Sequence, residues 1–277
     1  LRRSRGLGDV YKRQVHQKFG SLPWNELIEV EIYYAENGFE ITPFLADILL
    51  RYSESLSLFA ETKEIFQLHY PNFKNKTLVQ KDLANTLKII ASKGRKGFYE
   101  GEIAEKISSE IKKNNGLISK SDLKNYSPVW REPLISSYRD TEIITMGPPS
   151  SGGLHVIQML NILENYDLKK IGHNSLEYIN LLTEVMKFAY ADRSKYLGDP
   201  DFYDVPIKKI TSKKYANDIN ENIQIGKLTP VNEINPGKYM DGESHETTHF
   251  SVVDKTGNVI SMTYTLNSTF GSKVVIE

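Results

Sequence analysis

Residues 247–271 read TTHFSVVDKTGNVISMTYTLNSTFG, and this stretch decides the fold. Two runs rich in β-branched and aromatic residues, 247–253 and 259–264, flank the turn sequence Asp254-Lys255-Thr256-Gly257-Asn258. Such runs around a Gly-Asn turn are typical of a β-hairpin, so the sequence predicts two antiparallel strands here. The polar stretch that precedes them, from about residue 217 to residue 246, predicts a long surface loop or linker.

Upstream of this hairpin the sequence predicts helices first, then strands and further helices. From residue 23 to about residue 122, apolar residues recur every three or four positions, which is typical of several short helices. Residues 130–146 predict strands, and the glycine-rich turn Gly147–Gly153 separates them from two helical segments that end near residue 198. The last residues, Val274–Ile276, read as another strand.

Composition excludes several classes of protein. The 277 residues are 39% hydrophobic and 25% charged, as in ordinary globular domains. Lysine plus arginine and aspartate plus glutamate both number 35, so no overall charge draws the chain to nucleic acid. No apolar run is long enough to span a membrane, and the absence of cysteine excludes disulfides and thiolate metal sites.

The first fourteen residues differ from the rest of the chain. Residues 1–14 carry five basic side chains and one acidic one, without the apolar core of a secretory signal. We interpret them as an unstructured leader or an artefact.

One candidate site is a zinc motif, because residues 245–249 read HETTH and fit the H-E-x-x-H pattern. In that pattern two histidines on one helix face bind zinc. Here a hairpin follows, and in a strand His245 and His249 would lie roughly 13 Å apart, at about 3.3 Å per residue. Strand geometry therefore disfavours the zinc hypothesis.

A second candidate is Thr247, which begins a predicted strand directly after a polar linker. A cut between Glu246 and Thr247 would give Thr247 a free α-amine with an ordinary pKa of about 8, able to accept the proton of its own hydroxyl. Such a residue is both nucleophile and base. Taken alone, the Thr247-Thr248 pair also fits a purely structural role.

A third candidate is the turn Gly147–Gly153, where a strand, a glycine-rich turn and a helix could hold a phosphate. The turn lacks both the Gly-Lys-Ser/Thr ending and the G-x-G-x-x-G spacing of nucleotide-binding loops. A tight structural turn, or one wall of an active site, fits it better.

Several segments together resemble one family, the γ-glutamyltranspeptidases (glutathione hydrolases). The resemblance is collinear from about Gly20 to the end. It rests on the segments GSLPW at 20–24, GPPSSGG at 147–153, AYADRS at 189–194 with YLGDP at 196–200, and the stretch 247–271. The last of these segments is the most specific.

The resemblance implies an α+β fold, the four-layer αββα sandwich of N-terminal-nucleophile hydrolases, here incomplete at both ends. It implies a precursor that cuts itself between Glu246 and Thr247. Residues 15–246 would then belong to the large subunit, and residues 247–277 would begin the small one. The Thr247 hydroxyl would form an acyl-enzyme with the γ-glutamyl group of glutathione or a related γ-glutamyl amide. Water, an amino acid or a peptide would then accept the γ-glutamyl group. No metal or organic cofactor is implied.

Further residues match the family pattern. Thr265 matches the threonine that supports the nucleophile, and Asn267 matches a side chain that holds the α-amino end of the γ-glutamyl group; both would bind substrate. We assign Thr248 and His249 to support of the strand. The segment Met146-Gly147-Pro148-Pro149 departs from the family's usual triple proline at this turn, which affects only the local loop geometry.

The resemblance also carries expectations about the chain as a whole. The family's substrate-clamping arginine and its oxyanion-hole segment lie outside these 277 residues, so we expect this chain alone to be inactive or barely active. A periplasmic or extracellular location is implied. The alternative function is a related N-terminal-nucleophile acylase, or a relative that processes itself without catalysing a reaction.

Overall fold

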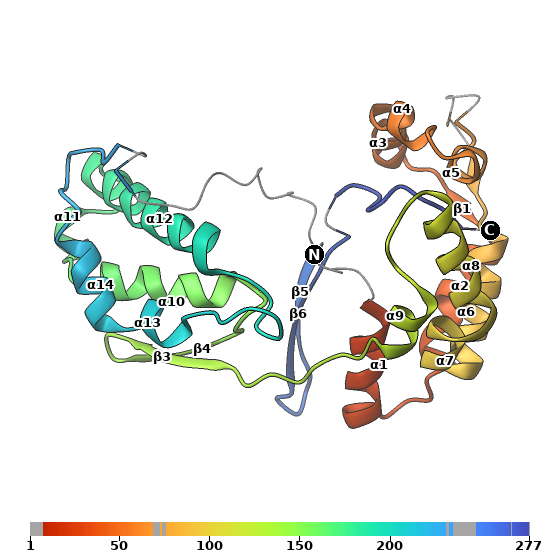
Figure 1. The fold of residues 1–277 in the computed structure, drawn as a ribbon, viewed down its shortest axis with the longest axis horizontal. Coiled ribbons are helices and arrows are strands. Elements are labelled where there is room, and N and C mark those ends of the chain that lie inside the picture. Colours follow the sequence, from red (N-terminus) through yellow and green to blue (C-terminus); the bar gives the residue numbers. More distant parts are fainter. Residues whose placement is uncertain are drawn as a thin grey trace. The chain divides into compact units, whose positions relative to one another are not determined.

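The computed structural model describes residues 8–68, 73, 76–230, 233–234, 248–266 and 268–276. The chain divides into two compact units. The first combines residues 1–128 with residues 243–277, and the second is formed by residues 129–242. Figure 1 labels most of the elements of both units.

The first unit is mostly helical. Its helices are α1 (Gly8–Phe19), the short 3-10 helix η1 (Glu26–Ile28), α2 (Glu29–Asn37), α3 (Pro43–Arg51), α4 (Ser53–Leu56), α5 (Ala60–Ile65), α6 (Lys81–Lys93), α7 (Arg95–Tyr99), α8 (Gly101–Lys113) and α9 (Lys120–Asn125). Two short strands, β1 (Phe39–Glu40) and β2 (Thr77–Leu78), pair antiparallel.

Local sequence signals explain where these helices begin and end. The Thr42 side chain caps α3, whose first residue is Pro43. Ser119 and Asp122 form a capping box at the start of α9. Helix α2 ends at Asn37 because Gly38, with φ at +82°, adopts a backbone conformation that glycine tolerates best. The predicted series of short helices is thereby confirmed.

The second unit pairs one hairpin with helices. The strands β3 (Leu134–Tyr138) and β4 (Thr141–Thr145) are antiparallel. The helices are α10 (Gly152–Leu163), α11 (Leu168–Ile171), α12 (Leu176–Tyr196), α13 (Ile207–Ile210) and α14 (Lys213–Asn220). Helices α10, α12 and α14 share a core that includes the fully buried Ile162, Leu181 and Val185. Together the two units make an α+β fold.

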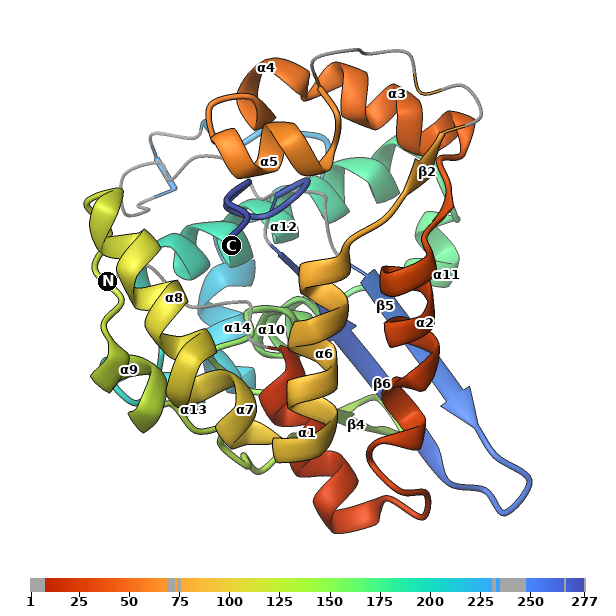
Figure 2. The ribbon, with the colours of Figure 1, turned by 90° about the vertical axis from the view of Figure 1, so that its right-hand side faces the viewer.

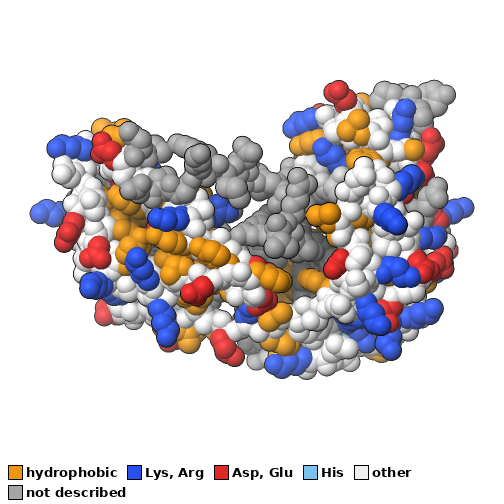
Figure 3. All heavy atoms as spheres, in the orientation of Figure 1, with side chains coloured by type: hydrophobic (Ala, Val, Ile, Leu, Met, Phe, Trp, Pro, Cys, Tyr) orange, Lys and Arg blue, Asp and Glu red, His pale blue; other side chains and the backbone are white. Residues whose placement is uncertain are grey.

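Apolar side chains also reach the surface of the second unit. Figure 3 shows hydrophobic side chains gathered there on the visible face. On α12, the large exposed hydrophobic residues are Leu176, Ile179, Met186 and Tyr190. Exposed apolar area of this kind is typical of a surface that another layer covers.

The predicted hairpin at residues 248–264 is confirmed. Strands β5 (Thr248–Val253) and β6 (Val259–Tyr264) pair antiparallel, with Thr248 opposite Tyr264 and Val253 opposite Val259. In the turn, the Asp254 carboxylate accepts hydrogen bonds from the Asn258 and Thr256 side chains and from their backbone amides. These bonds lower the pKa of Asp254 to about 2, so the carboxylate stays charged and holds the turn at any physiological pH.

The structure differs from the sequence expectations at three places. Residues 8–14, expected to be unstructured, form the first part of α1. The linker expected from about residue 217 begins later, because α14 runs to Asn220 and Ile219 and Ile223 are buried in the core. Residues 274–276 pair with no strand among the described residues. No helix in the described part of the chain is long and apolar enough to cross a membrane.

Candidate functional site

The structure tests only part of the predicted site. Glu246, Thr247 and Asn267 lie outside the described residues. Thr265 is described: it follows β6 directly and is half-buried. The predicted roles of these four residues therefore stay predictions.

The hairpin face that carries His249 is lined with hydroxyl groups. His249 Nδ1 lies 2.7 Å from Thr263 Oγ1 on the opposite strand, and His249 Nε2 lies 3.1 Å from Ser261 Oγ. Ser251 Oγ lies 3.0 Å from Ser261 Oγ. These contacts agree with the assignment of His249 to support of the strand.

The conformation at His249 also bears on the zinc hypothesis. The two-histidine motif requires a helix over residues 245–249. Thr248 and His249 already belong to β5. Within the described residues, no cluster of three or more histidine, aspartate or glutamate side chains has metal-binding geometry.

The glycine-rich turn at 147–153 lies between β4 and α10. A Cβ atom at Gly153 would lie 2.1 Å from the Met146 carbonyl oxygen and 2.4 Å from Thr145 Oγ1. Only glycine allows the start of α10 to approach β4 so closely. This close packing supports the interpretation of the segment as a tight structural turn.

Behind this turn lies a buried polar network that sequence reasoning missed. His155 Nδ1 lies 2.7 Å from Gln158 Oε1, and Gln158 Nε2 donates a 2.5 Å hydrogen bond to Asp192 Oδ2. The Tyr215 hydroxyl donates to both Asp192 oxygens at 3.0 Å. The network ties α10, α12 and α14 together. No local sequence pattern indicates this network, because Gln158 and Tyr215 lie 34 and 23 residues from Asp192.

The chemistry of the network fixes the tautomer of His155. Because the Gln158 amide nitrogen donates to Asp192, its oxygen faces His155, so Nδ1 carries the proton and Nε2 does not. His155 is only 6% exposed, and its Nε2 has no hydrogen-bond partner among the residues that the structure describes. Burial lowers the pKa of His155 and raises that of Asp192.

We expect His155 to make stability depend on pH. In the unfolded chain a histidine takes up a proton below about pH 6.5, whereas folded His155, with its lowered pKa, does not. Stability should therefore fall as the pH drops below about 6.5, until the folded pKa is reached. The buried Asp192, with its raised pKa, contributes with the opposite sign at lower pH.

Urea unfolding between pH 5.5 and 7.5 tests this, with His155→Gln compared with wild type. The variant should lose part of the pH dependence. If the free energy of unfolding depends on pH equally in the two proteins, His155 is not responsible for the pH dependence. His173→Gln is the matched control, because His173 is exposed.

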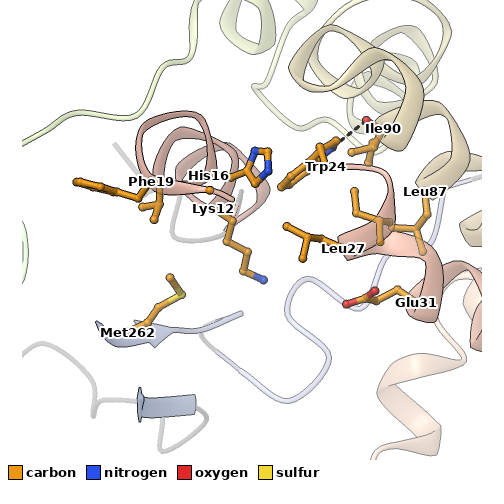
Figure 4. A pocket seen from close by; sticks show the side chains of 12 residues that line it. Lys12, His16, Phe19, Trp24, Leu27, Glu31, Leu87, Ile90 and Met262 are labelled. Carbon is orange, nitrogen blue, oxygen red and sulfur yellow. Dashed lines mark hydrogen bonds between the residues drawn. The ribbon is translucent and has the colours of Figure 1, made fainter. Parts of the chain in front are cut away.

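One pocket of about 460 Å³ lies in the first unit, between α1, η1, α2, α6 and β6. Figure 4 shows its wall and the hydrogen bond from Trp24 Nε1 to the Ile90 carbonyl. Its labelled lining residues are Lys12, His16, Phe19, Trp24, Leu27, Glu31, Leu87, Ile90 and Met262. The lining is mostly apolar. Of the predicted catalytic and substrate-binding residues, Thr265 is the one that the structure describes, and the pocket does not include it.

The fold is similar to those of transpeptidases and acylases of known structure. The crystal structure of the Helicobacter pylori γ-glutamyltranspeptidase matches with a TM-score of 0.76 and 42% identity, covering 83% of this chain and 67% of that one. The glutathione hydrolase proenzyme of Escherichia coli is 48% identical over 93% of this chain and 45% of its own length. An acylase proenzyme from a Pseudomonas strain is 38% identical over 94% of this chain and 46% of its own.

Residues 11–277 match the γ-glutamyltranspeptidase family model. The chain belongs to the γ-glutamyltranspeptidase family. It spans less than half the length of these two proenzymes.

Proposed function

We propose that the protein is a γ-glutamyl hydrolase and transpeptidase, which acts on glutathione and related γ-glutamyl amides through an acyl-enzyme on Thr247. The observation that carries this proposal is the family match across residues 11–277, which includes the whole threonine-rich hairpin. The 48% identity to the glutathione hydrolase proenzyme of Escherichia coli supports the same substrate class.

The hairpin register supports a pairing of Thr247 with Thr265. Thr248 lies opposite Tyr264, so the residues that come next on the two strands are Thr247 and Thr265. Extending the register by one step would place their side chains on the same face, as cross-strand neighbours about 5 Å apart. At that distance the Thr265 hydroxyl could hydrogen-bond the Thr247 hydroxyl.

The first chemical step is the cut that frees Thr247. The Thr247 hydroxyl attacks the carbonyl carbon of Glu246, and the peptide C–N bond breaks as the α-amine leaves with a proton. Water then hydrolyses the resulting ester, which restores the hydroxyl and leaves a carboxylate on Glu246. The same threonine now carries a nucleophile and a base with an ordinary pKa of about 8.

The second step is γ-glutamyl transfer. The hydroxyl of Thr247 attacks the γ-carbonyl of the substrate while its own α-amine accepts the proton and passes it to the leaving amine. Water, an amino acid or a peptide then takes the γ-glutamyl group from the ester. Asn267 would hold the α-amino end of that group.

The proposal includes the larger architecture. Residues 15–246 would belong to the large subunit and residues 247–277 to the small one, in a four-layer αββα sandwich. The exposed apolar side chains of α12 support this sandwich, because further layers would cover them. A periplasmic or extracellular location follows from the same family resemblance.

An acylase is the second candidate, because the acylase proenzyme from Pseudomonas is 38% identical. Two anilides separate the two functions: γ-glutamyl p-nitroanilide and glutaryl p-nitroanilide, which differ only in the α-amino group. We expect the complete gene product to cleave the first at least tenfold faster. Faster cleavage of the glutaryl compound would identify an acylase.

We expect Thr265→Val to lower kcat for the γ-glutamyl anilide by about 10- to 100-fold, because a hydrogen bond to the nucleophile is lost. Thr265→Ser keeps a hydroxyl and should retain most of the activity. The matched control is Thr141→Val, because Thr141 is exposed in the second unit. Full activity in Thr265→Val would remove Thr265 from the site.

A further inference from the structure

The segment that follows the hairpin is folded into tight turns. The Gly271 amide donates to the Ser268 carbonyl at 2.7 Å, and the Lys273 amide donates to the Phe270 carbonyl at 2.9 Å. Phe270 and Lys273 both have φ at +62°, a region that side chains other than glycine rarely adopt. Such a backbone persists only where its surroundings hold it.

Phe270 inserts its ring among the helices of residues 42–66. The ring centroid lies 5.4 Å from that of Phe66 and 6.3 Å from that of Tyr52, both in edge-on or tilted geometry. Phe270 thereby packs against the core that contains the fully buried Leu49 and Leu56 of α3 and α4.

Thr62 of α5 holds the same segment by its backbone. Its side chain is 1% exposed, and its hydroxyl donates to the Lys273 carbonyl at 2.8 Å while accepting from the Val275 amide at 3.1 Å. Both partners lie more than 200 residues away along the chain. Figure 2 shows the end of the chain, in dark blue, beside α5. The buried Thr62 hydroxyl thus makes two hydrogen bonds to the backbone of residues 273–275.

The Lys273 side chain adds a third contact. Its ammonium group donates to Ser55 Oγ at 2.9 Å and lies 5.4 Å from the centre of the Tyr52 ring. The turn before it is also compact, because a Cβ at Gly271 would lie 3.3 Å from Leu266 Cβ. Residues 265 and 266 therefore follow directly on β6, and residues 268 and 269 lead directly into the anchored Phe270.

We propose that Phe270, Lys273 and Thr62 form an anchor that joins the threonine-rich hairpin segment to helices α3, α4 and α5. The anchor positions Thr265, and it keeps the piece that begins at Thr247 bound to the helices after the chain is cut. The positioning role rests on the function proposed above. The three anchor residues act through the turn and are positioning residues.

The anchor itself is tested without any self-cleavage, in the complete gene product carrying Thr247→Ala. Hydrogen exchange at the Val275 amide should be about tenfold faster in Thr62→Val, which removes the acceptor, and within about twofold of the parent in Thr62→Ser, which keeps it. Thr183→Val is the matched control, because the Thr183 hydroxyl donates to the Ile179 carbonyl within the same helix, α12. Unchanged exchange in Thr62→Val would overturn the anchor.

The positioning role is tested in the protein with Thr247 intact. We expect Thr62→Val to raise KM for γ-glutamyl p-nitroanilide about 3- to 10-fold with a smaller change in kcat. Thr62→Ser, which keeps the hydroxyl, should have a KM close to that of the unmutated protein. A normal KM in Thr62→Val, together with fast Val275 exchange, would overturn the positioning role alone. Absence of turnover in the unmutated protein, with the exchange result intact, would contradict the proposed function and leave the anchor standing.

Retention of the cut piece needs a separate measurement. After self-cleavage, we expect Phe270→Leu to release the piece that begins at Thr247 at a lower urea concentration than the unmutated protein does, as followed by gel filtration. Phe202→Leu is the matched control, because Phe202 is 79% exposed. Equal release in the two variants would show that Phe270 does not hold the pieces together.

Discussion

The complete gene product carrying Thr247→Ala should remain one uncut chain and should lose γ-glutamyl transfer by about 10³-fold or more. The size of this effect follows from the double role proposed for Thr247, because one substitution removes the hydroxyl that cuts the chain and the hydroxyl that forms the acyl-enzyme. Without the cut, the α-amine proposed as the base is never released. Both losses should therefore appear together.

Intact-mass and N-terminal analysis check the cut, and turnover of γ-glutamyl p-nitroanilide checks the transfer. The unmutated protein should give two pieces, with a new N-terminus at Thr247. Thr247→Ser should still cut itself, because serine keeps the hydroxyl. Thr248→Ala, one residue further along β5, is the neighbouring control and should be cut normally. If the unmutated protein folds but stays uncut, Thr247 has no free α-amine to act as the base. That result would favour a non-catalytic relative.

The hairpin could be predicted from the sequence because its determinants are local. Asp254, Gly257 and Asn258 lie within five residues, and the turn they form fixes the register of both strands. Extending this register by one step would pair Thr247, which precedes Thr248, with Thr265, which follows Tyr264. The helix starts at Thr42 and Ser119 are equally local. The family resemblance added the roles of Thr247, Thr265 and Asn267, which the pattern alone left open.

The rest depends on contacts between distant parts of the chain. Val274–Ile276 has the composition of a strand, but the Val275 amide bonds to the side chain of Thr62, 213 residues away. Likewise, the polar composition after residue 217 indicates a loop, although Ile219 and Ile223 are buried against α10 and α12. Tertiary packing outweighs local propensity at such positions. A single sequence does not indicate which distant residue each of them contacts.

Asp192→Ala should cause the largest loss of stability among the single substitutions considered, about 2–4 kcal/mol. Asp192 is 9% exposed and accepts hydrogen bonds from Gln158 and Tyr215. Its removal leaves a buried amide and a half-buried hydroxyl without acceptors in the space between α10, α12 and α14. An unpaired buried donor costs more than the bond itself contributes, so the loss should exceed that of an ordinary hydrogen bond.

Urea unfolding followed by circular dichroism measures this loss. Asp218→Ala, at an exposed position of α14, is the matched control and should stay within about 0.5 kcal/mol of the unmutated protein. Tyr215→Phe alone should cost about 1 kcal/mol. In the double variant with Asp192→Ala it should cost less, because the Tyr215 hydroxyl has by then lost its acceptor. Additive losses would show that the two side chains act independently, and the network would then not join the three helices as one unit.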